Sequence, residues 1–392
     1  MSMQSKRMID RRVVGCSAIA LVIFLWYVAL HAGISQLIFV VIGVGLGISL
    51  YHAGFGFTGA WRRFLLYGQG DGVRAQMIML SLAVLLFFPT LAAGSVFDRP
   101  VHGFVFPIGV SVAMGAFMFG IGMQLGGGCA SGTLTAVGSG HLRMLVTLLF
   151  FIIGSVVATF HMPWWLSLPQ VPGYGLISQW GWIPALSVNI LLFTTIIVIS
   201  LILEKSVPGR ILGENSQPRC IQKSVIWRLL SGPWPLIWGS IALALFNYAT
   251  LLTAGRPWSI TSGLALWGAK SAESIGIDVV SWPAWSRAIL DTSLAQDITS
   301  VMNISIILGV TMAAGLAGCF RLIGCASWRS LGAAIIGGIM LGYGARLAFG
   351  CNIGAFFSGI ASGSLHGWLW FLCALAGNLI GIRLRPWFNL SS

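Results

Sequence analysis

Long apolar stretches recur along the whole chain and are separated by short polar segments. A stretch of about 20 apolar residues matches the thickness of a bilayer core when it forms a helix. Because a backbone inside a membrane must satisfy its own hydrogen bonds, such stretches predict helices and not open strands. We predict ten spans, at residues 13–31, 34–53, 75–93, 104–124, 143–160, 182–203, 233–254, 299–319, 331–349 and 366–384.

The composition supports an all-α polytopic membrane protein. Of the 392 residues, 57% are hydrophobic and 8% are charged, whereas soluble proteins carry about 25% charged residues. The 51 glycines fit membrane helices, which use glycine for close packing and for breaks. The first apolar stretch is longer than the core of a secretory signal and no small-residue cleavage site follows it, so we expect it to remain as a span.

The basic residues predict the orientation of the chain. A net charge of +13 could indicate a nucleic-acid partner, but these residues lie between spans, which is typical of the positive-inside rule. With ten spans, 17 of the 22 Lys and Arg residues fall on one side. We therefore expect a multi-pass protein of the inner (plasma) membrane, with both termini cytoplasmic, lipid as its surroundings and no nucleic-acid partner.

One stretch of fifteen residues occurs twice, at residues 118–132 and 340–354, with seven identical positions. The identities include Gly128 and Cys129 in the first copy, and Gly350 and Cys351 in the second. Five spans, an odd number, separate the two copies, so their orientations are opposite. We predict two inverted five-span repeats: residues 1–203, in which the sixth span at 182 already starts the second half, then a cytoplasmic loop at 204–232, then the remainder of the second half at 233–392.

The glycines of this motif predict broken or re-entrant helices at the centre of the protein. Each glycine costs about 1 kcal/mol relative to alanine inside a helix, so residues 126–128 should interrupt the fourth span. We expect Gly132 and Gly354 to let the chain turn and restart as a short helix. A helix that restarts inside the membrane directs free N–H groups and partial positive charge at its surroundings. Many transporters build their sites in this way; the alternative is that the glycines serve close packing only.

Arg346 lies within the ninth span, at the motif position that Gln124 occupies in the first copy. An arginine inside a span costs about 3 kcal/mol or more. All nine acidic residues fall in loops, so no acidic partner is predicted. This pattern favours the passage of an anion over that of a cation or a proton. The alternative is that Arg346 binds backbone carbonyls and only stabilises the fold.

The cysteines provide the candidate chemistry. Their spacing indicates neither a disulfide framework nor a metal site, and we expect no cofactor. Cys129 and Cys351 differ from the other five because they lie at the two breaks. A thiol near free N–H groups is either a reactive nucleophile or a neutral, polarizable group that a soft anion contacts and leaves. Further candidate residues beside the breaks and in short polar segments are Ser131, Asn352, Thr261 and His366.

Two segments resemble the YeeE/YedE family of sulfur-transport membrane proteins. They are GCASG at residues 128–132 and GARLAFGCNIGAFFSGIASGSLHGWLW at residues 344–370, and the likeness extends from about Gly47 to the C-terminus. The resemblance implies short broken helices that meet at the centre of an hourglass-shaped path for thiosulfate, with cysteines along it. It carries over to Cys129, Cys351, Arg346 and Asn352. The extra N-terminal span favours the longer YedE type, which is associated with selenium metabolism.

Several functions remain open at this point. The first is a permease, not an enzyme, for a thiosulfate-like anion, with a small cytoplasmic sulfur-carrier protein as a further partner. The second is transport or handling of a selenium compound, and the third is a membrane sulfur- or selenium-transfer enzyme with a persulfide on one motif cysteine. An enzyme needs a base beside its thiol, and none lies within four residues of either cysteine. A structural subunit of a redox complex is a further reading, implied by the resemblance alone.

The predicted topology has a direct test. Ten spans put Cys220 in the cytoplasm and Asp278 outside. In variants with one cysteine, an impermeant maleimide should label Asp278→Cys in intact cells but label Cys220 only after lysis. Labelling of position 220 from outside would contradict both the topology and the inverted repeat.

Overall fold

The computed structural model describes residues 9–206, 225–324 and 327–390 of the chain. These residues are almost entirely helical, and only four strands of two residues each occur among them. Ten helical segments of the described chain are long and apolar enough to cross a membrane. The prediction of an all-α polytopic membrane protein with ten spans is therefore confirmed.

The long helices agree with the predicted spans in number and order. They are α1 (Arg11–Ala32), α2 (Leu37–His52), α4 (Asp71–Ala93), α5 (Val110–Gly126), α7 (Leu142–Ser167), α9 (Trp182–Lys205), α11 (Leu236–Ala254), α14 (Ile298–Leu316), α15 (Trp328–Leu347) and α17 (Leu365–Leu384). The start of α5 is later than the predicted residue 104. The extended segment before it includes Pro107 and a strand, which together keep the helix from starting earlier.

Shorter elements connect the long helices. The short α-helices are α3 (Phe57–Tyr67), α6 (Ala130–Gly138), α8 (Leu176–Trp180), α10 (Val225–Ser231), α12 (Thr261–Ser274), α13 (Arg287–Asp291) and α16 (Ser358–Ala361). Three 3-10 turns are η1 (Ile34–Gln36), η2 (Val279–Ser281) and η4 (Arg385–Phe388), and η3 (Asn352–Phe357) is a π-helix. Strand β1 (Ser95–Val96) pairs with β2 (Arg99–Pro100), and β3 (Ile108–Gly109) pairs with β4 (Gln170–Val171).

The predicted loop at 204–232 is only partly described. Its last residues form α10. Residues 207–224, which include Cys220, lie outside the described part of the chain, so the predicted position of Cys220 stays a prediction.

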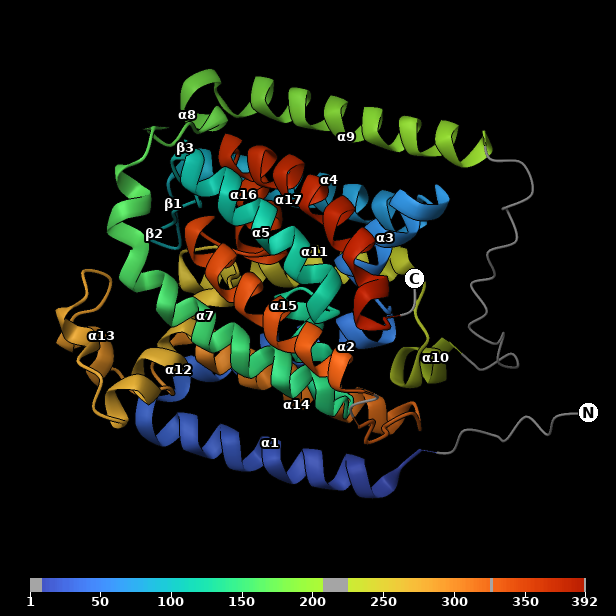
Figure 1. The fold of residues 1–392 in the computed structure, drawn as a ribbon, viewed down its shortest axis with the longest axis vertical. Coiled ribbons are helices and arrows are strands. Elements are labelled where there is room, and N and C mark those ends of the chain that lie inside the picture. Colours follow the sequence, from blue (N-terminus) through green and yellow to red (C-terminus); the bar gives the residue numbers. More distant parts are fainter. Residues whose placement is uncertain (1–8, 207–224, 325–326, 391–392) are drawn as a thin grey trace, which may run out of the picture.

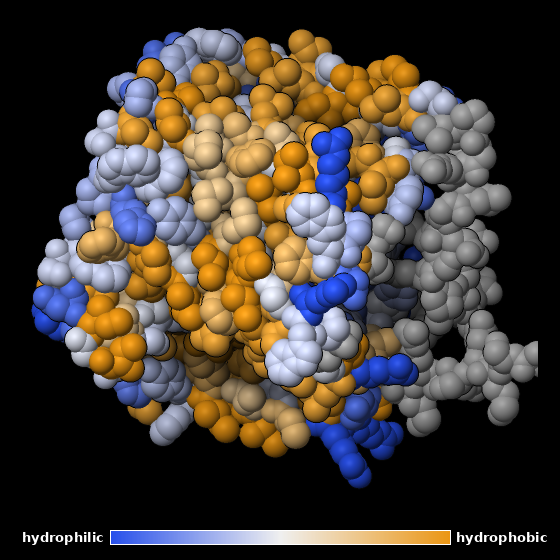
Figure 2. All heavy atoms as spheres, in the orientation of Figure 1, coloured by the Kyte–Doolittle hydropathy of each residue, from blue (hydrophilic) through white to orange (hydrophobic). Residues whose placement is uncertain are grey.

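The long helices run side by side between two ends of the molecule. In Figure 1, α3 and α10 lie toward the right end, whereas β1, β2 and α13 lie toward the left end. Helices α1 and α9 lie on opposite flanks of the bundle. Figure 2 shows hydrophobic residues over the middle of this face and the most hydrophilic residues toward its two ends. This distribution is the one that a bilayer crossing the middle requires.

The helices pack in matched sets. Helix α2 packs against α14 while α4 packs against α11, and α5 packs against α17 while α7 packs against α15. On the flanks, α1 packs against α14 and α9 packs against α4. The motif offset relates α5 to α15 and α7 to α17, so the contact between α5 and α17 has its counterpart in the contact between α15 and α7.

The first glycines of the repeated motif are packing positions. A methyl group on Gly120 would collide with the backbone of Ala374 in α17, and one on Gly342 would collide with the backbone of Phe151 in α7. Gly122 and Gly344, two positions later, are similarly confined by backbone. Because small residues let membrane helices approach closely, these glycines fix α5 and α15 against their neighbours.

Candidate functional site

The first copy of the motif interrupts its helix where the glycines predict. Helix α5 ends at Gly126, and Gly127 adopts a φ of +94°, a left-handed conformation that favours glycine. Cys129 is extended and forms the N-cap of α6, which starts at Ala130. The chain therefore ends one helix and begins the next within residues 127–129.

The second copy makes a tighter break. Helix α15 ends at Leu347, after which Phe349 has a φ of +56° and Gly350 a φ of +158°. A bulky residue at positive φ costs on the order of 1–3 kcal/mol and occurs mostly at functional sites. Cys351 then caps η3, whose π-helical geometry is also frequent at functional sites.

Gly132 and Gly354 do not make the turns that we expected of them. Gly132 is already the third residue of α6, and Gly354 is the third residue of η3. Gly127 and Gly350 make the turns instead, because they are the motif glycines that have a positive φ at the breaks. The two later glycines therefore need another explanation.

Side chains hydrogen-bond the carbonyl oxygens that the breaks release. The Arg143 guanidinium donates to the last two carbonyls of α5, at 2.6 and 3.1 Å. Ser111 Oγ donates to the Leu347 carbonyl at 2.8 Å. Trp370 Nε1 donates to the Gly350 carbonyl at 3.2 Å. Irregular backbone inside a membrane requires such partners, and here they fix both breaks.

In both copies the cysteine sulfur caps the short helix. Cys129 Sγ accepts a hydrogen bond from the Gly132 N–H at 3.5 Å and lies 3.3 Å from Ser131 Oγ. Cys351 Sγ accepts a hydrogen bond from the Ile353 N–H at 3.4 Å. The exposed fractions of the two cysteines are 1% and 0%. Both belong to one apolar cluster, and the segments that they cap, α6 and η3, contact each other, so the structure brings the two thiols to one enclosed region.

The helices that follow the two cysteines lead to opposite ends of the molecule. After α6, His141 forms a β-bridge with Ile323, which follows α14. After α16, Ser364 forms a β-bridge with Gly175, which precedes α8, and the Ser362 hydroxyl accepts a hydrogen bond from the N–H of residue 104, before α5. Arg143 hydrogen-bonds both the end of α5 and the start of α15, and Ser111 near the start of α5 hydrogen-bonds the end of α15. Residue 323 therefore lies toward the end of α5 and residue 104 before its start, so α6 and α16 run away from the shared cluster in opposite directions.

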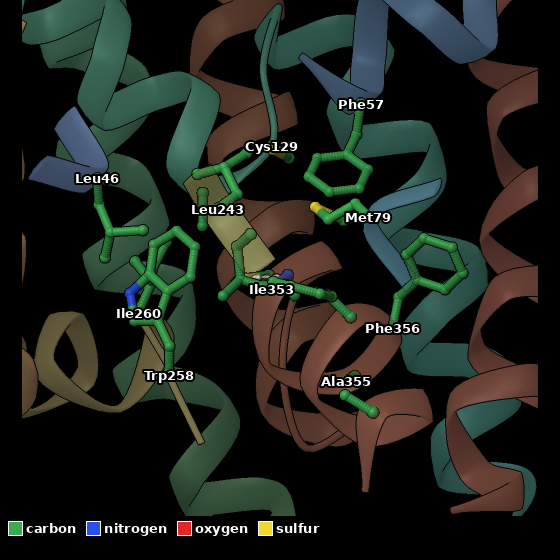
Figure 3. Packing of buried hydrophobic residues seen from close by; sticks show 14 of the residues in the cluster. Leu46, Phe57, Met79, Cys129, Leu243, Trp258, Ile260, Ile353, Ala355 and Phe356 are labelled. Carbon is green, nitrogen blue, oxygen red and sulfur yellow. Dashed lines mark hydrogen bonds between the residues drawn. The ribbon is translucent and has the colours of Figure 1, made fainter. Parts of the chain in front are cut away.

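Four short helices begin at this cluster. Figure 3 shows Phe57, Cys129, Ile260 and Ile353 packed around one centre, and they mark the starts of α3, α6, α12 and η3. No side chain caps the N-terminus of α3 or of α12. A helix N-terminus presents unsatisfied N–H groups and partial positive charge. The centre of the protein is therefore a place where a small negative charge is favoured.

Two polar side chains near the second break lack protein partners. Asn352 is 0% exposed, yet neither Nδ2 nor Oδ1 makes a hydrogen bond. The Arg346 Nε is also buried without a partner, and no ion pair in the described chain includes Arg346. An unpaired buried polar group costs about 1–3 kcal/mol, so such groups point to water or a ligand. Within the described ranges, no group of three His, Cys, Asp or Glu residues is placed to hold a metal ion.

Two further predicted site residues make hydrogen bonds within the fold, and each leaves one buried polar atom, Gln124 Oε1 or His366 Nε2, without a partner in the described chain. Gln124 Nε2 donates to Asn378 Oδ1 at 2.6 Å and to the Thr58 carbonyl at 3.3 Å, which ties α5 to α17 and α3. The His366 ring nitrogen Nδ1 lies 2.7 Å from Ser364 Oγ, and the ring fills the space beside α16. The hydrogen bonds of both side chains thus go to neighbouring segments and not to the thiols.

Arg346 lies in the last turn of α15, and the other seven predicted site residues lie at three of the four helix starts. They are Gly128, Cys129 and Ser131 at α6, Gly350, Cys351 and Asn352 at η3, and Thr261 at α12. The sequence pattern did not single out the fourth start, at α3. A weak repeat, in which residues 53–54 and 254–255 are both Ala-Gly, was the only signal for it.

Comparisons with known proteins bear on this site. A family model described as "Sulphur transport" matches residues 52–380. The chain is 32% identical over 159 residues to "Probable transporter YedE" of Escherichia coli (strain K12), and 30% identical over 171 residues to that of Salmonella typhimurium. These alignments cover 40% and 42% of this chain, and only 40% and 43% of the relatives' own length. It is also 27% identical to "Thiosulfate transporter TsuA" of Spirochaeta thermophila over 361 residues, which is 86% of this chain and 95% of that protein.

The hydrogen bonds that Arg143 makes at the first break predict how removal of this side chain affects stability. Arg143→Met removes the charged donor from the end of α5, and a hydrogen bond to a charged group contributes about 1.5–3 kcal/mol. We expect a lower melting temperature of the purified protein in detergent. Arg329→Met is the matched control, because Arg329 is exposed at the start of α15. Equal melting temperatures of the two variants would contradict a capping role for Arg143.

Proposed function

The chain belongs to the sulphur transport family, whose model matches residues 52–380, and we propose that it carries a thiosulfate-like sulfur anion across the inner membrane. Cys129 and Cys351 are two successive stations of the path in this proposal. A relative that aligns with 86% of the chain is named a thiosulfate transporter. The proposal includes cytoplasmic termini and a small sulfur-carrier protein that receives the anion on the cytoplasmic side.

The observation that carries this proposal is the meeting of two cysteine-capped helix starts in one buried cluster. Backbone N–H groups and helix dipoles favour a negative charge there. The ion pairs of the described chain involve Asp71, Glu204 and Glu273, which lie outside this cluster. The local electrostatics thus support an anion as the permeant species.

Thiols suit a sulfur anion better than other donors do. A path must bind its substrate strongly enough to admit it and weakly enough to release it. The S–H group is a weak donor and its sulfur is polarizable, so it matches the soft sulfur end of thiosulfate. Two thiols that cap neighbouring helix starts could pass the ion along without full rehydration.

Arg346 and Asn352 complete the anion environment in this proposal. Both carry buried polar atoms without protein partners, which leaves them free to contact the oxygen atoms of the substrate. Thr261 at the start of α12 and Ser131 beside Cys129 add hydroxyl groups at the same cluster. Gly128 and Gly350 contribute to the path through the turns in which they lie. Gln124 supports the site by tying α5 to α17 and α3, and His366 supports it by packing beside α16.

We further infer that the two parts of the chain are inverted repeats, with residues 182–203 already in the second half. The matched sets of helix contacts support this arrangement. The opposite directions of α6 and α16 support it too, since inversion turns one copy of a helix to face the other way. In such a protein the two stations lie on opposite sides of the membrane centre.

A sulfur-transfer enzyme is the less favoured reading. The hydrogen-bond partners of the two thiols within the described chain are backbone N–H groups and the Ser131 hydroxyl, none of which is a base at neutral pH. Enzymatic activation of a thiol uses an adjacent base. The transport or handling of a selenium compound stays a prediction from family resemblance.

Uptake of labelled thiosulfate into proteoliposomes tests the function and the stations together. Cys129→Ser and Cys351→Ser should each impair uptake severely, because serine keeps a donor but is harder and more strongly hydrated. Cys16→Ser, Cys373→Ser and Cys220→Ser are matched controls and should transport normally at equal protein content. Equal, mild effects at all five positions would refute the two-station path, and no uptake by the unmodified chain would refute the function.

A charge substitution tests the role of Arg346. Arg346→Gln introduces the residue type of the first copy and removes a cation whose insertion costs about 3 kcal/mol. We expect the variant to insert and fold, which size-exclusion chromatography checks, but to take up less thiosulfate. Unchanged uptake would mean that the arginine serves the fold alone.

A further inference from the structure

Gly132 and Gly354 are glycines that neither packing nor backbone conformation requires. A methyl group on Gly132 would have one neighbour within 4 Å apart from its own helix, Cys129 Sγ at 3.7 Å. A methyl group on Gly354 would likewise have one neighbour, Ser259 Oγ at 3.5 Å. Both distances are ordinary van der Waals contacts, and neither glycine has a positive φ.

The contrast with the other glycines of the motif is sharp. Methyl groups on Gly120 and Gly342 would collide with backbone, and Gly350 needs its positive φ. Glycine inside a helix costs about 1 kcal/mol relative to alanine. Both copies of the motif nevertheless keep it at the third residue of a buried helix. Something other than stability must keep a side chain out of this space.

Two polar side chains near Gly354 make no hydrogen bond within the described chain. The Asn352 amide, two residues before Gly354 and on a different face of the helix, is fully buried. The Ser259 hydroxyl, which faces Gly354, makes no hydrogen bond within the described part of the chain and is partly exposed. On the other side, Gly132 adjoins the Cys129 sulfur and is itself partly exposed. Open space beside available donors and acceptors is typical of a ligand site and not of a packed core.

We infer that Gly132 and Gly354 keep the substrate passage open beside Cys129 and Cys351 and set its width. The inference rests on the proposed function and adds two residues that determine specificity. The passage admits a small sulfur oxyanion because the faces of α6 and η3 that border it carry hydrogen atoms in place of side chains. At Gly354 the Ser259 hydroxyl also borders the passage.

Alanine at either position should separate transport from stability. Gly132→Ala and Gly354→Ala should melt no lower than the unmodified protein, because alanine favours the helix. Each should lower thiosulfate uptake by about tenfold or more, since one methyl group in a fitted site has effects of this order. Gly15→Ala and Gly332→Ala are matched controls in helices with open space around the glycine, and both should leave uptake unchanged.

A second substitution tests whether Ser259 borders the passage beside Gly354. In Gly354→Ala combined with Ser259→Gly, the only neighbouring atom of the new methyl group is absent, so much of the uptake should return. Ser259→Gly alone serves as the reference. If the pair transports no better than Gly354→Ala, Ser259 does not border the passage.

Thiol modification provides a measurement that does not depend on transport. Methyl methanethiosulfonate, a small neutral reagent, should modify the Cys129 peptide more slowly in Gly132→Ala, and the Cys351 peptide more slowly in Gly354→Ala, as followed by mass spectrometry. Unchanged uptake and unchanged modification in both variants would overturn the inference and leave the transport function intact. Slower modification in a protein that takes up no thiosulfate would overturn the function and retain the passage.

Discussion

The unpaired backbone groups at the two helix breaks inside the membrane determine how the centre of this protein is built. Each break releases carbonyl oxygens on one side and N–H groups on the other. Arg143, Ser111 and Trp370 bind the carbonyl oxygens. Within the described residues, the side-chain atoms that accept from the N–H groups are two weakly accepting sulfur atoms. This asymmetry leaves an enclosed region with a surplus of donors, which is the condition that an anion needs and a cation does not.

Hydropathy and glycine content are local properties, so they were sufficient to predict the ten spans and the break at residues 126–128, whereas the role of the two cysteines stays a prediction. The contacts that distinguish Gln124 from Arg346 are not local. Gln124 binds Asn378, a residue 254 positions away, and nothing in the sequence marks that pair. The turn role assigned to Gly132 and Gly354 failed for a related reason, because spacing within a motif does not show which glycine has a positive φ. The start of α3 was missed because its repeat signal is two residues long.

The repeated motif combines three separate requirements in one short segment. Its first glycines permit helices to touch and its middle glycines permit the chain to turn, and in our proposal its last glycine leaves space for the substrate. These requirements occur in the order in which the chain reaches the centre. The cysteine stands between the turn and the space, where its sulfur both caps a helix and borders the opening. Because several requirements fall on one short segment, many of its positions are identical in the two copies.

The different surroundings of Gln124 and Arg346 have an evolutionary consequence. A molecule assembled from two first copies would hold two Gln124 side chains without Asn378, which belongs to the second part, and no Arg346 cation. One assembled from two second copies would hold two such cations and no Gln124 to bind Asn378, with an insertion cost of about 3 kcal/mol for each arginine. Neither part could pair with a duplicate of itself to rebuild this site. After any ancestral duplication, the two parts have become complementary, and covalent linkage in one chain guarantees that each meets the partner it requires.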